Sequence, residues 1–508
     1  MQTNILDWLE VTSARCPDAP AVGDDQIDCT WAQLADTARR AGSFLASRTM
    51  PRHPVAFYLE KSVSAFAAML GTVYAGCCYS VLDTRQPAAR TLQVLDTLTP
   101  ALLVTDEAHA AAAAALGDSG QIIRLDDLLA APADAALLAN RRRQAVDVDP
   151  LYINFTSGST GVPKGVTVSH RSVLDFIPQF AEIFGITQND ILGNQAPFDF
   201  DVSVKDLYTA LYTGAKVQII PRAYFSQPTK LMDYLADHEV TILVWAVSAM
   251  CFVSIMNGFS YRIPSHVRQV LFSGEVMPIK HLMKWKSALP HARFVNLYGP
   301  TEITCNCTYA ILPDRDFAPD EALPIGRAFP NEKVFLLDEN DALVTVPGQA
   351  GEICVSGTAL ALGYYADPVR TAQAFTQNPL NTNWYERVYR TGDLARYDES
   401  GSLYYIGRRD FQIKHMGHRV ELGEIEAAAM RCDAVTRACC TFDAERQRLH
   451  LFYTGSCEKA ALLAALKESL PPFMQPNTAV QLDEMPLNKN GKIDRTALAA
   501  LTKKGAHK

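Results

Sequence analysis

A loop rich in glycine and hydroxyl groups is the segment of this sequence best suited to chemistry. Residues 156–165 read Thr-Ser-Gly-Ser-Thr-Gly-Val-Pro-Lys-Gly. Glycine lets the backbone approach a ligand closely, and the exposed N–H groups of such a turn bind anions. The hydroxyls and Lys164 add donors and positive charge. The segment is therefore predicted to hold a polyphosphate.

The spacing in this loop differs from the Walker pattern G-x-x-x-x-G-K-[ST], because Lys164 is followed by Gly165. Apolar, β-prone residues precede the loop at 151–155 and follow it at 165–170. The loop is therefore predicted to be a hairpin tip between two strands. For the loop taken alone, an ordinary Ser/Gly/Thr-rich surface loop is the alternative.

Two further segments place nucleotide-binding groups after apolar runs. In Asn-Leu-Tyr-Gly-Pro-Thr-Glu at 296–302, the Tyr298 ring can face a base and Glu302 can hold Mg²⁺, which prefers carboxylate oxygens. In Tyr-Arg-Thr-Gly-Asp-Leu at 389–394, a strand is predicted to end at Gly-Asp, where Asp393 can accept hydrogen bonds from ribose hydroxyls. An ordinary turn is the alternative for each segment.

Two segments near the C-terminus are rich in charge. Residues 407–421 contain two glycines and alternating Phe411 and Ile413, which predicts a hinge followed by a strand or hairpin. In residues 486–495, Asn-Gly favours a tight turn that would place Lys492 at an exposed tip. The alternatives are a solvated charged face and a solvated tail lysine.

Composition narrows the class of protein. With 508 residues, two or three lobes are expected. The net charge of −8 argues against broad nucleic-acid binding. No run of 18 apolar residues and no signal peptide are evident, so no membrane span is predicted. Twelve scattered cysteines without a C-x-x-C pair predict reduced thiols in a cytoplasmic protein.

Hydrophobic patterns predict an α/β fold. Two amphipathic helices are expected within residues 30–75, and a surface helix at the alanine-rich residues 108–116. Strand-like segments alternating with helices predict a mostly parallel sheet with helices outside, in a large N-terminal domain of mixed βα subdomains. From about residue 325, shorter strands predict a β-rich subdomain. Strands are expected at 54–59, 101–104, 121–125, 215–220, 241–247, 269–272, 293–297, 333–337 and 351–356, and helices at 421–431 and 458–469.

Taken together and in this order, the five motif segments closely resemble the adenylate-forming superfamily, which comprises acyl-CoA synthetases, luciferases and the adenylation domains of nonribosomal peptide synthetases. The resemblance covers roughly residues 10–500. Segments 412–426 and 488–494 look like the amino-acid-activating branch. The resemblance implies a large AMP-binding domain at residues 1–409 and a small, mobile α+β lid domain at residues 410–508.

The resemblance implies that ATP and a carboxylate form an acyl-adenylate with release of pyrophosphate, after which a thiol takes the acyl group. Thr156, Glu302 and Lys492 would be catalytic, with Mg²⁺ on Glu302 and the lid hinge at Asp410. Lys492 would bridge the substrate carboxylate and the α-phosphate. The implied ATP contacts are Thr156, Ser157, Gly158, Ser159, Thr160, Gly161 and Lys164 for the phosphates, Gly274, Glu275, Asn296, Tyr298, Gly299 and Thr301 around adenine, and Asp393 and Arg408 at the ribose.

The resemblance also implies an amino-acid substrate. Residues 200–208 match the segment in which the amino-acid branch places an Asp against the substrate ammonium, and Asp201 holds that position. Trp245 and Leu297 are expected to limit the cavity, which favours a small or medium substrate. The implied pocket consists of Asp201, Val202, Lys205, Trp245, Leu271, Ser273, Leu297, Cys305 and Asn306.

Lys205 stands at a position that is often apolar in the family. It can pair with an acidic group of the substrate, or it can neutralise Asp206 or Glu275 without touching a ligand. We favour the second, structural interpretation at this stage.

The implied partner is a separate phosphopantetheinyl carrier protein, because no carrier or condensation motif accompanies these segments. The chain resembles D-alanine–carrier protein ligases and free-standing adenylation enzymes of peptide pathways. Ser273 replaces the Cys usual in D-alanine ligases, which argues against strict D-alanine specificity. The alternatives are an acyl-CoA ligase for a non-amino acid and a non-catalytic adenylate-binding protein.

Overall fold

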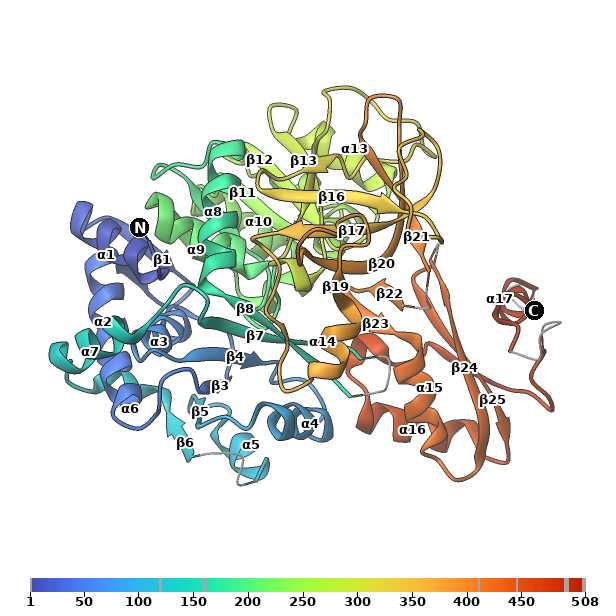
Figure 1. Cartoon of the computed structure of the whole chain (residues 1–508), viewed down its shortest axis with the longest axis horizontal. Coiled ribbons are helices and arrows are strands. Elements are labelled where there is room, and N and C mark those ends of the chain that lie inside the picture. The colour runs from blue at the N-terminus through green and yellow to red at the C-terminus, as the bar shows by residue number, and fades with distance from the viewer. Residues whose placement is uncertain are drawn as a thin grey trace. The chain divides into compact units, whose positions relative to one another are not determined.

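The computed structural model describes residues 2–117, 121–158, 162–409, 412–444, 446–487 and 493–504. The chain forms two compact units. Unit 1 comprises residues 1–84, 98–154 and 165–407, and unit 2 comprises residues 85–97, 155–164 and 408–508. Strands and helices alternate through the larger unit, and the smaller unit combines both (Figure 1). The predicted α/β fold class is confirmed.

Unit 1 contains a nine-stranded sheet in the order β15-β14-β13-β12-β11-β9-β10-β1-β2. Its central strands are parallel, and antiparallel strands lie at both edges. The strands predicted at 215–220, 241–247, 269–272 and 293–297 are confirmed. The strands are β1 (Pro20–Gly23), β2 (Asp28–Thr30), β9 (Ile191–Asn194), β10 (Lys216–Ile219), β11 (Ile242–Ala246), β12 (Gln269–Ser273), β13 (Arg293–Tyr298), β14 (Thr308–Ile311) and β15 (Arg327–Ala328).

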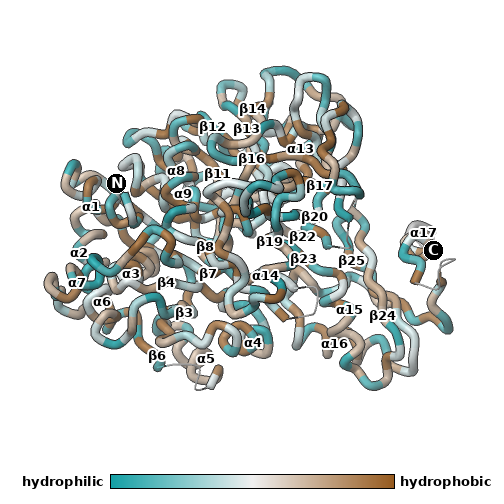
Figure 2. Tube along the Cα trace, viewed as in Figure 1, coloured by the Kyte–Doolittle hydropathy of each residue, from teal (hydrophilic) through white to brown (hydrophobic). Residues whose placement is uncertain are grey.

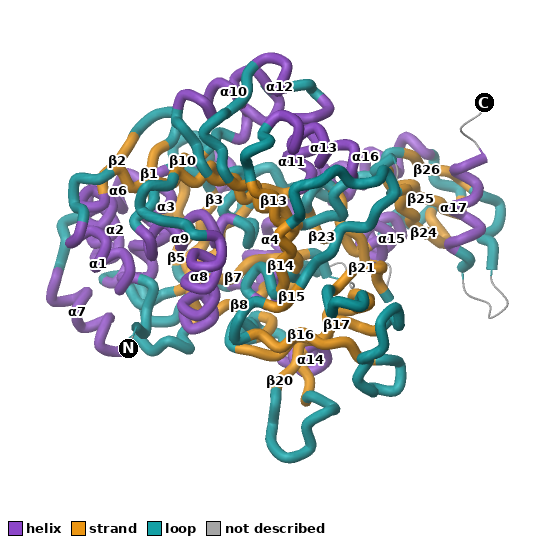
Figure 3. Tube along the Cα trace, turned by 90° about the horizontal axis from the view of Figure 1, so that it is seen from above, coloured by secondary structure: helices purple, strands orange, loops and turns teal. Residues whose placement is uncertain are grey.

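Helices cover both faces of this sheet, which explains why its central strands are nearly all apolar. Figure 3 shows α10 to α13 on one side and α8 and α9 on the other. Side chains alternate along a strand, so Val244 and Leu271 join the core under α8 and α9, whereas Trp245 and Phe272 join the core under α11 and α13. The helices are α8 (His170–Phe184), α9 (Ser203–Thr213), α10 (Pro228–Asp237), α11 (Val247–Ile255), α12 (Gly258–Tyr261) and α13 (Ile279–Ala288).

A second, seven-stranded sheet has the order β18-β8-β7-β4-β3-β5-β6. β7 and β8 are hydrogen-bonded neighbours, so the predicted strands on either side of the glycine-rich loop are confirmed. The strands are β3 (Pro54–Tyr58), β4 (Cys78–Leu82), β5 (Leu102–Thr105), β6 (Gln121–Arg124), β7 (Pro150–Thr156), β8 (Lys164–Ser169) and β18 (Gly363–Tyr364).

The helices beside this sheet agree only in part with the prediction of two amphipathic helices within residues 30–75. α2 is amphipathic and begins with a capping box at Thr30. The prediction is wrong for α3, which is buried all round except at Ser64. It packs closely on α2, since a Cβ on Gly71 would lie 2.5 Å from the Cβ of Ala41. The helices are α1 (Leu6–Arg15), α2 (Trp31–Ala46), α3 (Val63–Tyr74), α5 (Ala110–Ala115), α6 (Leu125–Ala130) and α7 (Ala135–Gln144).

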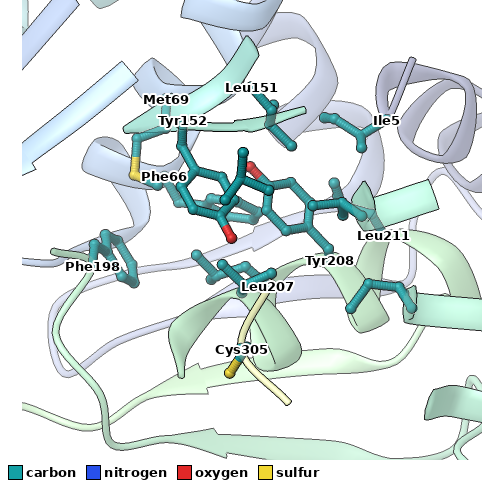
Figure 4. Packing of buried hydrophobic residues seen from close by; sticks show 14 of the residues in the cluster. Ile5, Phe66, Met69, Leu151, Tyr152, Phe198, Leu207, Tyr208, Leu211 and Cys305 are labelled. Carbon is teal, nitrogen blue, oxygen red and sulfur yellow. The ribbon is translucent and has the colours of Figure 1, made fainter. Parts of the chain in front are cut away.

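The larger core of unit 1 joins elements far apart in sequence. Figure 4 shows Phe66 of α3, Tyr152 of β7 and Tyr208 of α9 packed together. Each fully buried large side chain stabilises the fold by about 1.5–3 kcal/mol. Outer helices carry the polar surface, and Figure 2 shows α7 as largely hydrophilic. The predicted surface helix at 108–116 is confirmed as α5, in which only Ala113 is buried.

A five-stranded antiparallel sheet forms the predicted β-rich part of unit 1. Residues 389–393 lie inside β20 rather than at a strand end, so that prediction is wrong. The register against β17 shifts between Glu352 and Cys354, and Gly392 has φ of +72°, which together form a bulge. The elements are β16 (Glu332–Leu337), β17 (Gly351–Gly357), α14 (Pro368–Ala374), β19 (Phe375–Gln377), β20 (Arg387–Tyr397) and β21 (Leu403–Arg408).

Unit 2 contains a hairpin, a three-stranded sheet and helices around a core of its own. The hairpin and the helices expected at 421–431 and 458–469 are confirmed. Within the residues described, no helix is long and apolar enough to cross a membrane. The elements are α4 (Ala88–Leu98), β22 (Gln412–His415), β23 (His418–Glu421), α15 (Leu422–Met430), β24 (Val435–Asp443), β25 (Arg448–Gly455), α16 (Lys459–Ser469), β26 (Thr478–Gln481) and α17 (Arg495–Lys504).

The buried carboxyl of Glu332 makes the stability of unit 1 depend on pH. One oxygen accepts the Ala359 N–H at 2.9 Å, and the other has no partner among the described residues. Burial raises the pKa of Glu332 to about 8. Because the folded chain then holds a proton that an unfolded Glu with a pKa of about 4.3 releases, stability falls as pH rises through this window.

We expect Glu332→Gln to remove this loss, because the amide accepts the same hydrogen bond without a charge. The free energy of unfolding at pH 8 should rise by about 1–3 kcal/mol, with little change at pH 4, as measured by urea unfolding. The exposed Glu339 provides the matched control, Glu339→Gln. A gain that is equal at both pH values would contradict this account.

Candidate active site

The site lies at the carboxyl ends of the parallel strands of the nine-stranded sheet. In parallel sheets these ends share one edge, which is where α/β proteins bind ligands. Asp201 follows β9 just before α9, Ser273 ends β12, and Tyr298 ends β13. Sheet register therefore gathers residues from three separate predicted segments.

Two of the predicted nucleotide residues are in direct contact. The Tyr298 hydroxyl donates to Asp393 Oδ2 at 2.5 Å, and both side chains are buried. Burial and the Asp393 carboxylate raise the pKa of Tyr298 well above its ordinary value, so the hydroxyl keeps its proton and acts as a donor. The Tyr298 ring also lies 6.2 Å from that of Tyr405. The bulge in β20 thus brings Asp393 to the end of β13.

The other residues expected around adenine lie on β12 and β13 or follow directly. Asn296 is buried in β13, where its side-chain amide donates to the Pro324 carbonyl at 2.8 Å. Gly274 follows β12 with φ of +101°, and the space where its Cβ would stand is open to 4 Å. That backbone can therefore be approached closely by a ligand. Glu275 follows in the same turn.

The predicted Mg²⁺ ligand, Glu302, is fully buried in a short 3₁₀ turn after β13, η2 (Thr301–Ile303). Its Oε1 accepts the Tyr364 hydroxyl at 2.8 Å. Among the described residues, no group of three or more acidic, His or Cys side chains converges to hold a metal. One carboxylate nevertheless fits Mg²⁺ that is bound mostly by phosphate oxygens and water.

The segment that follows, residues 304–307, is folded against the end of β13. Thr304 and Cys305 have φ of +53° and +94°, a conformation that is costly for residues with a side chain. The turn is held by the Cys307 N–H, which donates to the Tyr298 carbonyl at 2.9 Å, and by the Thr304 hydroxyl, which donates to Ala359 O at 2.6 Å. This unusual backbone fixes the direction of Cys305 and Asn306.

The predicted substrate residues are all buried. The Lys205 ammonium, on the first turn of α9, donates to Asn306 Oδ1 at 2.6 Å. Burial raises the pKa of the neighbouring Cys305 thiol to about 12, so this group stays uncharged. The nine side chains are Asp201, Val202, Lys205, Trp245, Leu271, Ser273, Leu297, Cys305 and Asn306.

The position of Trp245 differs from the expectation that Trp245 and Leu297 limit the same pocket. Its indole belongs to the core under α13, where the ring lies 6.0 Å from that of Trp285. The indole N–H donates to the Gly193 carbonyl at 2.9 Å. Leu271 and Leu297 point to the other face of the sheet, because strand side chains alternate.

The glycine-rich loop belongs to unit 2 together with the hairpin β22–β23. The Ser157 hydroxyl donates to the Arg419 carbonyl. The Thr156 hydroxyl is buried and has no hydrogen-bond partner among the described residues, which suits a group that binds a ligand. The predicted positions Ser159, Thr160, Gly161, Asp410 and Lys492 lie outside the described residues. Leu487 and Ile493, which flank the Lys492 segment, form an antiparallel bridge.

Sequence reasoning missed Tyr364. This residue lies on β18 at the edge of the seven-stranded sheet, and its hydroxyl bonds to Glu302, 62 residues earlier in the chain. No motif surrounds Tyr364, and its role depends on pairing between β18 and β8.

The arrangement defines a nucleotide-using α/β enzyme, and comparison with known proteins identifies its family. Residues 9–365 match the model of the AMP-binding enzyme family, and residues 424–492 match that of the AMP-binding enzyme C-terminal domain. The chain therefore belongs to the AMP-binding enzyme family, and the predicted resemblance to adenylate-forming enzymes is confirmed. It is a ligase, and membership of this family implies the use of ATP.

Individual relatives cover nearly the whole chain. It is 34% identical to an L-proline–[L-prolyl-carrier protein] ligase of Streptomyces coelicolor, with 95% of this chain and 94% of the relative aligned. It is 32% identical to tyrocidine synthase 2 of Brevibacillus parabrevis over 97% of this chain but only 13% of that relative. The structure resembles holo-PA1221, an NRPS protein containing adenylation and PCP domains, with a TM-score of 0.85 at 26% identity, covering 98% of this chain and 84% of that one.

We expect Gly299→Ala to disturb the site through its backbone. A Cβ at this position would lie 2.5 Å from the Asn306 Cα and 2.8 Å from the Cys305 carbonyl oxygen. Segment 304–307 must then shift, which should destabilise the protein by about 1–3 kcal/mol. The Kd for ATP should also rise several-fold, because Tyr298 and Glu302 flank this glycine.

Thermal unfolding and calorimetric ATP titration measure both effects. Gly407→Ala provides the control, since a Cβ there would meet no atom within 4 Å. If the two alanine variants behave alike, the close approach at Gly299 has no energetic importance.

Proposed function

We propose that this protein activates an amino acid as aminoacyl-AMP, with ATP as co-substrate, and transfers it to the phosphopantetheine thiol of a separate carrier protein. The observation that carries the proposal is the buried Asp201 carboxylate, which lies at the same sheet edge as the Tyr298–Asp393 pair. A buried carboxylate is a strong binding group for an ammonium ion. A fatty acid has no such group. The L-prolyl-carrier protein ligase and the adenylation–PCP structure among the relatives support the same reaction.

Each predicted group has a role that suits its surroundings. Asp393 and Arg408 would hold the ribose, and Tyr298, kept in place by Asp393, would face the adenine. The hydroxyls of the loop beginning at Thr156, with Lys164, would hold the phosphates. Asp201 would orient the substrate so that its carboxylate meets the α-phosphate. This is catalysis by positioning.

The attack brings a carboxylate against a phosphate, so like charges must be neutralised. Lys492 would supply a positive charge to the substrate carboxylate and the α-phosphate. Glu302 would hold Mg²⁺, which when bound neutralises phosphate charge. The carboxyl of Glu302 is already fixed by the Tyr364 hydroxyl, so its direction is set before the ion arrives.

The compartment proposed for this reaction is the cytoplasm. All twelve cysteines are free thiols, including pairs of neighbours such as Cys77 and Cys78. Reduced, buried thiols of this kind are typical of proteins in reducing compartments.

We expect Lys492→Ala to lower amino-acid-dependent ATP–pyrophosphate exchange by two or more orders of magnitude, because the main neutralising charge is lost. ATP should still bind, since the groups around adenine and ribose stay intact. Lys503→Ala, a change at a lysine of the C-terminal helix α17, serves as the control. Undiminished exchange in Lys492→Ala would remove Lys492 from the proposed mechanism.

We also propose that residues 410–508 act as a lid that turns about Asp410, presenting Lys492 for adenylation and another face, near Lys414 and Gly417, for thiol attack. Asp410→Pro should then slow thioester formation on the carrier more than exchange, because a fixed φ restricts the hinge. Pre-steady-state thioester formation and pyrophosphate exchange give the two rates. Equal losses in both would count against a hinge at this residue.

The two alternative functions would give different results in the same exchange assay. An acyl-CoA ligase would exchange with non-amino carboxylic acids and use CoA as the thiol. A non-catalytic protein would bind ATP and exchange with no acid.

A further inference from the structure

Two thiols of unit 2 are in direct contact, one at the connection from α15 to β24 and the other at the connection from β25 to α16 (Figure 1). The Sγ atoms of Cys432 and Cys457 lie 3.2 Å apart, and one thiol donates a weak hydrogen bond to the other. A disulfide bond is about 2.05 Å long, so the two sulfur atoms need to approach by only about 1.2 Å to form one. The cysteines are 25 positions apart in the chain, so the fold of unit 2 brings them together.

Backbone contacts hold both segments in place independently of the thiols. The Ser456 N–H donates to the Ala434 carbonyl at 2.9 Å, and Val435 pairs with Gly455 across β24 and β25. Gly455 has φ of +120°, and a Cβ on it would lie 2.1 Å from the Ala434 oxygen. The two segments are therefore in close backbone contact beside the thiols. Because the backbone already holds this approach, joining the thiols requires only small side-chain rotations.

The two thiols differ in their access to solvent. Cys432 is partly exposed, whereas Cys457 is 5% exposed and belongs to the hydrophobic core of unit 2. The hydrogen bond with Cys432 raises the pKa of the Cys457 thiol, so Cys457 keeps its proton near neutral pH. Cys432 is thus the thiol that a reagent in solution reaches first. The residues next to the cysteines in the chain are all exposed: Arg431, Asp433, Ser456 and Glu458.

We propose that Cys432 and Cys457 form a reversible disulfide on exposure to a low-molecular-weight disulfide, which makes this pair a redox-sensitive modification site of unit 2. In a reducing compartment the resting state is the dithiol, and disulfides that form there are mostly transient. Neither cysteine is among the residues proposed above to hold ATP, metal or amino acid. The proposal therefore stands or falls independently of the proposed function.

Two exchange steps form the bond. The Cys432 thiolate attacks one sulfur of the small disulfide, which gives a mixed disulfide and releases one small thiolate. Cys457 then loses its proton, and its sulfur attacks the Cys432 sulfur, which forms the Cys432–Cys457 bond and releases the second small thiolate. The protein loses two electrons and two protons in total, and the small disulfide is reduced to two thiols. A dithiol reductant reverses both steps.

The bond would link the end of α15 to the segment before α16 and close a loop that contains β24 and β25. A cross-link of this kind stabilises a protein mainly by restricting its unfolded chain. The oxidised form of unit 2 should therefore open locally less often than the reduced form.

The first test uses the full-length protein, with glutathione disulfide as the probe near neutral pH. Peptide mapping without reduction should find one cross-linked pair of peptides, which contains Cys432 and Cys457. Dithiothreitol should restore both thiols. The proposal is overturned if Cys432 remains a mixed disulfide with glutathione, or if both residues remain thiols while other cysteines react.

The second test removes one thiol at a time. In Cys457→Ser the mixed disulfide between glutathione and Cys432 should accumulate, because the thiol that resolves it is missing. In Cys432→Ser no mixed disulfide should form at Cys457, which is buried. Cys16→Ser is the matched control, since Cys16 is also partly exposed but belongs to unit 1, and it should still form the Cys432–Cys457 bond. Loss of glutathione from Cys432 in Cys457→Ser as fast as in the unmodified protein would exclude Cys457 as the partner.

Hydrogen exchange measured by mass spectrometry tests the effect on unit 2. Oxidation should slow exchange of the most protected amides between residues 432 and 457 by about 10-fold or more, and dithiothreitol should reverse the change. Equal exchange in the two forms would overturn the stabilising effect. Thermal unfolding of the reduced variants shows whether they fold. If Cys457→Ser does not fold, Cys457→Ala takes its place, and mapping of the unmodified protein already decides the pairing.

Discussion

The site depends on the close approach between the end of β13 and the segment that follows it. At Gly299 there is no room for a side chain, because the Asn306 Cα would lie 2.5 Å from its Cβ. As a result, residues 298–306 contact three different parts of unit 1. Tyr298 meets Asp393, Glu302 meets Tyr364, and Asn306 meets Lys205. The residues proposed to hold the nucleotide, the metal and the substrate are therefore coupled through one short segment of backbone.

A second constraint is the burial of charge. Glu302 and Lys205 are fully buried, and Asp201 and Asp393 nearly so. Each such group is stabilised only if hydrogen bonds or opposite charges satisfy it. The hydroxyls of Tyr298 and Tyr364 donate hydrogen bonds to Asp393 and Glu302, which fixes the direction of these two carboxyl groups. The proposed site would therefore need little reorganisation on binding ATP and substrate, and such preorganisation is a main source of catalytic power.

Much of this structure can be predicted from sequence, because local pattern determines it. The strands on both sides of the glycine-rich loop and the alternating elements of the nine-stranded sheet follow from hydrophobic periodicity. The family follows from five ordered motifs, although no one of them decides it alone. The roles of Ser159, Thr160, Gly161, Asp410 and Lys492 stay predictions, since these residues lie outside the described structure.

Other features could not be predicted because they depend on contacts between distant segments. α3 is buried all round as a result of packing at Gly71, which periodicity does not reveal. The bulge at Gly392 depends on the register of β20 against β17. For this reason β20 continues past Asp393, whereas the sequence predicted that the strand ends there. The side of the sheet that Trp245 faces depends on strand register. The hydrogen bond from Lys205 to Asn306, 101 residues later in the chain, likewise depends on how the two segments pack.

The most direct measurement of the central claim is the identity of the adenylate itself. The enzyme is incubated with ATP, Mg²⁺ and a mixture of amino and non-amino carboxylic acids, and the bound product is identified by mass spectrometry. The account predicts an aminoacyl-AMP, formed with one pyrophosphate released for each adenylate. An adenylate formed only from acids without an amino group would contradict it.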